Sequence, residues 1–134
     1  MGNRAVITHE PYNEDAVGIY LHWNGGRASI EGFLRAAKTL NFRSSDPQYA
    51  MAYLTGIITQ FFGDGLSCGI GRLKELDCDN GDNGTYVIKN WEIVGRMFHS
   101  SDDSEEINEE KTTAICEQIV TQWPKSKVAN KVSN

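Results

Sequence analysis

The sequence predicts an α+β domain in two layers: an antiparallel sheet of about four strands, arranged as two hairpins, with two helices on one face and a further helix at the C-terminus. Short β-branched or aromatic segments occur in two pairs, each joined by turn residues. Two longer segments carry apolar residues at the three-to-four-residue spacing of a helix. The alternation of strand and helix that a parallel sheet requires is missing from the pattern.

Residues 4–8 and 16–23 are the strands of the first predicted hairpin. The first is a β-branched run and the second is apolar and aromatic, with a loop rich in turn residues between them. The pattern stops at Asn24, Gly25 and Gly26, where glycine permits a sharp change of direction.

Residues 29–40 and 47–62 are the predicted helices. The first has one apolar stripe interrupted by Gly32, which weakens a helix by about 1 kcal/mol relative to alanine. The second has clear ends: Asp46 can cap the free amides, and Pro47 suits the first helical position. Gly63 can end this helix in a left-handed conformation.

The remaining segments complete the predicted domain. Residues 63–76 indicate a short strand or irregular segment followed by about one helical turn. Residues 85–88 and 91–94 form the second hairpin, with Lys89 and Asn90 as its two-residue turn. We expect a core domain over residues 1–99. Residues 100–134 then provide a polar acidic linker, a C-terminal helix over 105–123 and a basic tail.

Composition limits the classes of function that this chain can have. The chain has 134 residues and a formal net charge of −5. It contains no run of about 18 apolar residues and no apolar N-terminal stretch, so we expect a cytoplasmic protein without a membrane partner. Three widely spaced cysteines, Cys68, Cys78 and Cys116, favour a reducing compartment over a disulfide framework. The negative charge argues against direct nucleic-acid binding and favours a basic partner surface.

His22 is the first candidate for chemistry. It ends a predicted strand before a glycine-rich turn and could act as a general base or a metal ligand. His9 and His99 are isolated in the sequence, so no closely spaced pair of zinc ligands is present. The alternative is that His22 packs at the end of the hairpin.

The loop over residues 77–84 is the second candidate. Its acids Asp77, Asp79 and Asp82 suggest a calcium loop, but both possible registers fail at ligand positions, which leaves a polar loop or a weak divalent-ion site. Cys68 with His22 and one of these acids is a further alternative, against the interpretation that Cys68 is simply buried. The glycines of residues 63–71 match neither phosphate-binding nor dinucleotide-binding spacing.

Four sequence phrases carry a resemblance: NRAVIT at residues 3–8, GIYLHWNGG at 18–26, LDCDNGDNG at 76–84 and NWEIVGR at 90–96. Together they resemble a family of small proteins carried by bacterial phages and prophages. The resemblance spans residues 3 to about 98 and implies a mobile-element setting, with no catalytic residue to carry over. In that setting, small acidic proteins without catalytic signatures are frequently inhibitors of host defence, including anti-CRISPR proteins.

We therefore expect a non-enzymatic inhibitor, without a cofactor or metal, that binds a host defence protein or ribonucleoprotein effector stoichiometrically. Exposed acids with aromatic anchors would form its contact surface: Trp23, Asp77, Asp79, Asp82, Trp91, Asp102, Asp103, Glu105 and Glu106. The acids over residues 102–110 could equally be a solvated linker and helix start. A small hydrolase or nucleotide-modifying enzyme using His22 and the acids of 77–82, and a ligand-binding or homodimeric accessory protein, are the alternative functions.

Overall fold

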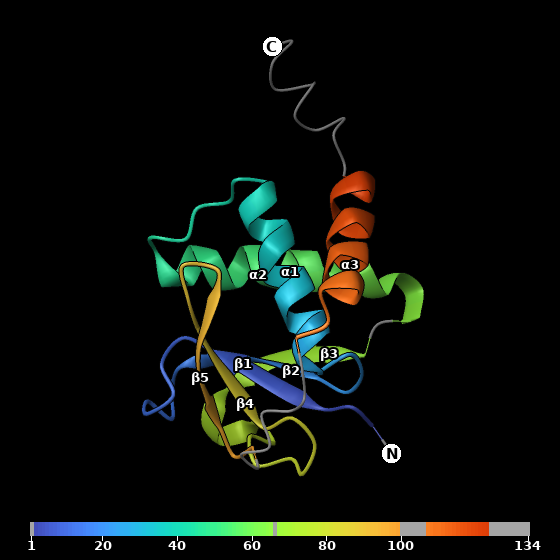
Figure 1. The fold of residues 1–134 in the computed structure, drawn as a ribbon. Coiled ribbons are helices and arrows are strands. Elements are labelled where there is room, and N and C mark those ends of the chain that lie inside the picture. The colour runs from blue at the N-terminus through green and yellow to red at the C-terminus, as the bar shows by residue number, and fades with distance from the viewer. Residues whose placement is uncertain (1, 66, 100–106, 124–134) are drawn as a thin grey trace.

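A computed structural model describes residues 2–65, 67–99 and 107–123. Within these residues, one mixed sheet has three α-helices on one side of it (Figure 1). The strands are β1 (Ala5–Thr8), β2 (Val17–Leu21), β3 (Cys68–Arg72), β4 (Thr85–Lys89) and β5 (Glu92–Met97). The helices are α1 (Arg27–Thr39), α2 (Pro47–Phe62) and α3 (Glu109–Gln122). The predicted α+β class is confirmed.

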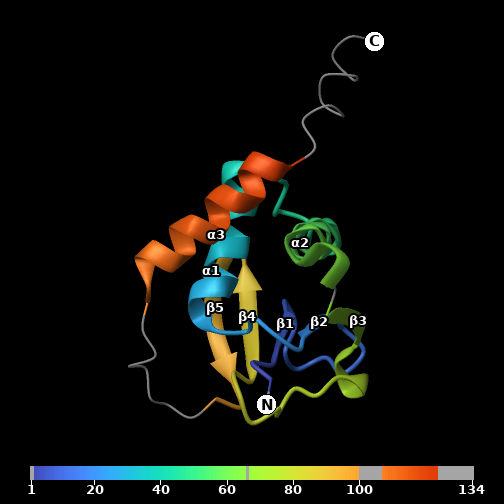
Figure 2. The same ribbon diagram turned by 90° about the vertical axis from the view of Figure 1, so that its right-hand side faces the viewer.

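The sheet differs from the prediction in strand number and in direction. Its order is β3-β2-β1-β4-β5, so five described strands replace the expected four. The neighbours β1 and β4 are parallel, whereas the other three pairs are antiparallel. The cause is the long connection over residues 73–84, which returns from β3 to the opposite side of β1 before β4 begins. Figure 2 shows this connection passing along the side of the sheet away from the helices.

This connection covers the outer face of the sheet. The short helix η2 (Leu73–Glu75) begins it, and Leu73 packs with Val6 and Ala16 in a small apolar cluster. The main core lies on the other face, between the sheet and the helices. Because alternate strand residues point to opposite faces, β1 contributes Ala5 and Ile7 to the main core and Val6 to the outer cluster.

The ends of α2 are those that the sequence predicts. Asp46 accepts a hydrogen bond from the Gln48 amide at 3.1 Å, Pro47 is the first helical residue, and Gly63 follows with a positive φ of 59°. The β4–β5 turn differs by one residue from the prediction. Asn90 and Trp91 both have positive φ and form the turn, which is the backbone twist that two-residue hairpins favour.

The C-terminal helix α3 packs directly on α1. A side-chain β-carbon at Gly32 would lie only 2.7 Å from Ile115 Cγ2, so the glycine permits the close approach of the two helices. Arg35 forms a two-pronged ion pair with Glu109 at 2.6 and 3.0 Å. Ile115 and Ile119 belong to the main core, so α3 forms part of the same packed unit as the sheet. Among the described helices, none is long and apolar enough to cross a bilayer.

Candidate binding groove

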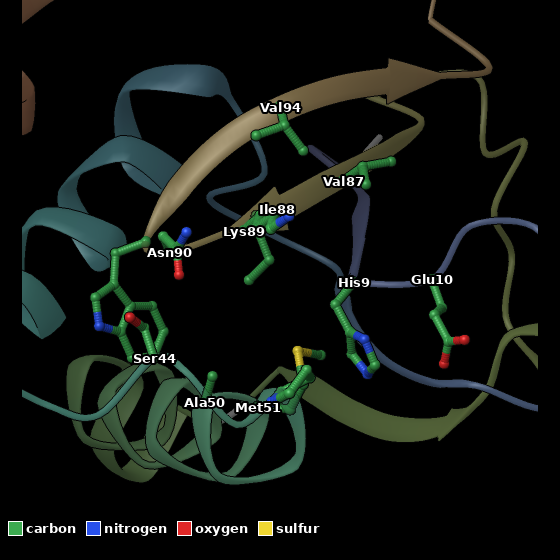
Figure 3. A pocket seen from close by; sticks show the side chains of 12 residues that line it. His9, Glu10, Ser44, Ala50, Met51, Val87, Ile88, Lys89, Asn90 and Val94 are labelled. Carbon is green, nitrogen blue, oxygen red and sulfur yellow. The ribbon is translucent and has the colours of Figure 1, made fainter.

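Two adjoining hollows lie where α2 faces the ends of β1 and β4, with volumes of about 510 and 470 Å³. They share His9, Glu10 and Met51, and we call them together the α2 groove. The larger hollow runs toward the β4–β5 hairpin and the smaller one toward β3. The larger hollow is lined by His9, Glu10, Ser44, Pro47, Ala50, Met51, Val87, Ile88, Lys89, Asn90, Trp91 and Val94 (Figure 3).

The walls of the groove are held by contacts beyond the groove itself. The Trp91 indole is 6% exposed, and its Nε1–H donates to the Phe42 carbonyl at 3.0 Å. Met51 is 2% exposed, and Figure 3 shows it rising from α2 toward the His9 side chain. The loop carrying His9 is tied down because Thr8 Oγ1 donates to the Val17 carbonyl and accepts from the Glu10 amide. These contacts hold the groove walls in place.

Two exposed hydrophobic side chains line this groove. Among the described residues, seven large hydrophobic residues are exposed, and of these Val94 (59% exposed) lines the larger hollow and Ile70 (57%) lines the smaller one. The remaining five do not line the groove: Tyr12, Trp23, Tyr49, Phe98 and Ile107. Exposed apolar surface with a polar rim is typical of an interaction site.

The polar groups of the larger hollow come from both walls. His9 and Glu10 project from the loop after β1, and Lys89 and Asn90 project from the β4–β5 hairpin. Such a mixture suits recognition, since apolar area provides contact while a few polar groups orient the bound molecule. The chemistry that this arrangement supports is binding.

The acidic loop over residues 77–84 lies away from this groove, next to the N-terminal segment. Asp82 accepts hydrogen bonds from the Arg4 amide at 3.0 Å and from Arg4 Nε at 2.8 Å, and these bonds hold the pKa of Asp82 below its usual value. Asp77 reaches the same guanidinium at 3.5 Å, whereas Asp79 is exposed. Asp82 therefore attaches the loop to β1, and of the three predicted contact acids only Asp77 and Asp79 are exposed.

Asn80 organises the interior of this loop. Its side chain is buried, accepts from the amides of Asp82 and Gly84, and donates to the carbonyls of Asp77 and Gly84. In the described part of the chain, no three His, Cys, Asp or Glu side chains gather as they would around a metal ion. The loop is thus organised by amide hydrogen bonds, which the sequence pattern of acids and glycines did not indicate.

His22 and Cys68 are not brought together as a catalytic pair. His22 Nδ1 lies 3.1 Å from the Tyr20 hydroxyl, and its ring meets Trp23 edge-on at 4.8 Å, so it packs at the end of the hairpin. Cys68 packs instead against the main core, and burial raises the pKa of its thiol despite a hydrogen bond with Thr59. A thiol held in its neutral form on the helix-facing side of the sheet is poorly suited to nucleophilic attack.

The two predicted aromatic anchors differ in exposure and in position. Trp23 is 44% exposed and does not line the α2 groove, whereas Trp91 is 6% exposed and lines its larger hollow. Burial follows from the positive φ of Trp91, which turns its ring inward toward Phe42. The predicted contact acids Asp102, Asp103, Glu105 and Glu106 lie outside the described residues.

Apart from Trp91, the groove residues were not predicted from the sequence. His9, Met51 and Val94 come from three segments that are far apart along the chain, so no local spacing connects them. The available signals were a histidine and a glutamate directly after a predicted strand, and an unusually broad apolar face on the second helix. No protein-family model, curated protein or solved structure matches this chain.

Proposed function

We propose that this chain acts by binding another protein at the α2 groove, and that the bound protein is a component of bacterial host defence. The observation that carries the binding proposal is the exposure of Ile70 and Val94 in two adjoining hollows that share His9, Glu10 and Met51. Exposed apolar area of this kind costs free energy in water, at about 25 cal/mol per Å², and a bound protein surface removes that cost.

A protein ligand fits this surface better than a small molecule. The groove extends over two hollows, with Val94 in the larger and Ile70 in the smaller, and both side chains are more than half exposed. A compact ligand would occupy one hollow and leave the exposed side chain of the other in contact with water. A protein segment lying along the groove covers both side chains.

The defence setting of the proposal rests on the resemblance of residues 3–98 to a phage and prophage family, together with the net charge of −5. A negative chain is attracted to basic surfaces, and proteins that hold nucleic acid are rich in such surfaces. The proposed partner is therefore a defence effector that presents apolar side chains bordered by Lys or Arg.

The binding proposal is tested by affinity capture from a defence-competent bacterial host, measured by quantitative mass spectrometry. The wild-type chain is compared with Val94→Glu, which places a charge in the groove, and with Ile107→Glu as a control on a side chain of similar exposure at the start of α3. We expect wild type and Ile107→Glu to recover one protein in near-equal amount, and Val94→Glu to lose it. Equal recovery by both variants would place the contact elsewhere.

The defence part is tested separately. Expression of the chain in a host with an active CRISPR system should raise the plaquing of a targeted phage, and Val94→Glu should abolish the increase while Ile107→Glu retains it. A captured partner without any change in plaquing would keep the binding proposal and reject the defence setting.

A further inference from the structure

The strand β3 lies at one edge of the sheet, and its backbone groups can be assigned to two sides. The His22 amide donates to the Ser67 carbonyl at 3.0 Å, and the Leu73 amide donates to the Ala16 carbonyl at 2.9 Å. Bonded pairs alternate along an antiparallel ladder, so the residues at positions 69 and 71 also bond to β2. The backbone groups of Cys68, Ile70 and Arg72 therefore point away from the sheet.

The outward side of β3 has no described strand beside it, and within the residues that the structure describes only one of its amides has a partner. That amide belongs to Arg72 and donates to Glu75 Oε1 at 3.1 Å. The N–H and C=O groups of Cys68 and Ile70 keep their capacity to bond another extended chain. Unsatisfied groups in a row of this kind form a template for a further strand.

The other edge of the sheet is protected in a way that β3 is not. The strand β5 has an irregular register against β4 at Val87 and Ile88, and its Glu92 pairs with Lys38 at 3.4 Å. Such bulges and charges discourage the addition of a strand. In contrast, β3 pairs regularly over its whole length and contains no proline, and its one charged residue, Arg72, lies at its end, where it pairs with Glu75 at 2.9 Å.

We propose that β3 pairs antiparallel with β3 of a second copy of this chain, about a two-fold axis at Ile70. The outward-facing residues are numbered symmetrically about this position, so Ile70 meets its own copy and Cys68 meets Arg72. Every outward N–H then faces an outward C=O, once the Arg72 amide leaves Glu75. The two sheets join into one continuous sheet across the axis.

Side chains favour the second copy as the occupant. Ile70 is 57% exposed on the helix side of the sheet, and pairing buries it against the same residue of the copy.

This pairing adds a consequence to the proposed function without depending on it. Ile70 lines the smaller hollow of the α2 groove, so the grooves of the two copies meet across the axis. The assembly would present two binding surfaces side by side on one rigid sheet.

The test is the mass of the purified full chain by sedimentation velocity, from about 1 µM to about 200 µM, where weak self-association changes the measured mass. We expect the mass to rise with concentration from 14.9 kDa toward twice that value. Ile70→Lys should raise the dissociation constant of the dimer at least tenfold. Ile107→Lys, a substitution at a side chain of similar exposure outside the sheet and the α2 groove, should leave it unchanged. Circular dichroism confirms that both variants are folded.

Three results would overturn the proposal: a monomer at every concentration, a dimer that Ile70→Lys leaves intact, or a dimer that both variants weaken equally. If Ile70→Lys does not fold, amide hydrogen exchange of the wild-type chain provides the second measurement. The Cys68 and Ile70 amides should exchange more slowly at high protein concentration than at low concentration. Exchange at those two amides that is independent of concentration would also reject the pairing.

Discussion

Individual polar side chains determine how the acidic loop is held. Arg4 binds both Asp77 and Asp82, and the buried Asn80 bonds the loop to itself. A loop that looks like a charged contact surface in the sequence is therefore partly a structural connection. The acid that attaches it is Asp82, and its effect on stability should depend on pH.

Asp82→Asn should destabilise the chain at neutral pH and much less in acid. The Arg4 hydrogen bonds lower the pKa of Asp82 in the folded state, so its contribution is complete above the unfolded pKa of about 3.9. The contribution disappears as the pH falls through the lower folded-state pKa. Urea unfolding of wild type and variant, from neutral pH to about pH 3, measures the difference in free energy of unfolding.

Asp79→Asn is the matched control for this experiment, because Asp79 is an exposed acid of the same loop with no described hydrogen bond. Its free energy of unfolding should follow that of wild type at every pH. A difference between wild type and Asp82→Asn that stays constant with pH would show that the ion pair with Arg4 is not the cause.

At the scale of the element, the two helical glycines have opposite roles. Gly32 allows α3 to approach α1, since a β-carbon there would lie 2.7 Å from Ile115 Cγ2 and 3.2 Å from the Thr112 carbonyl oxygen. Gly56 in α2 is exposed, and a β-carbon there would meet only Trp123, at an ordinary 3.8 Å. Glycine is required for packing at the first position and not at the second.

Gly32→Ala should lower the free energy of unfolding by about 1–2 kcal/mol, because the cost of overpacking exceeds the gain of about 1 kcal/mol in helix propensity. Gly56→Ala should raise it by about 0.5–1 kcal/mol, since only the propensity gain applies. Urea denaturation of the two variants measures both signs. Stabilisation by both substitutions would mean that α3 moves freely away from α1.

Helix ends were predictable because their signals are local. Asp46, Pro47 and Gly63 mark α2 within a few residues of its ends, and the structure confirms all three. Strand order was not predictable in the same way, because the pairing of β1 with β4 joins segments that are far apart in the sequence. Residues 68–72 were also ambiguous, since Gly69 and Gly71 interrupt the alternation that identifies a strand.

The candidate site was less predictable than the fold. The acids of the 77–84 loop indicated a contact surface because the sequence does not reveal that Arg4, more than 70 residues away, binds two of them. The sequence also does not reveal that Trp91 is buried, because a tryptophan with positive φ is uncommon and no pattern marks it. The α2 groove arises only when distant segments pack together.

At the scale of the whole molecule, the sheet and all three helices share one core. Ile115, Cys116 and Ile119 of α3 belong to the same buried cluster as Ile7 of β1 and Leu54 of α2. A small domain with one core unfolds as a unit. The C-terminal helix should therefore not separate from the sheet before the rest unfolds.

The thiol of Cys116, which is 6% exposed, reports this behaviour. In a chain with Cys68→Ala and Cys78→Ala, its reaction with a thiol reagent should accelerate at the same urea concentration at which circular dichroism detects unfolding. In the same background with Cys116→Ala, Ile107→Cys provides an exposed control that should react at once without urea. Reaction of Cys116 well before the main transition would show that α3 opens independently.

The parallel pairing of β1 with β4 has a consequence for synthesis on the ribosome. The partners Val6 and Thr85 lie almost 80 residues apart, and chains grow at about 5–20 residues per second. One side of β1 therefore remains without its neighbour for roughly 4–16 s after translation of β1. During that interval β1 and β2 can already pair, while the remaining side of β1 is available to other nascent chains. Correct folding of this chain is thus a late event in translation, and chaperones that cover exposed strands would act on it in that interval.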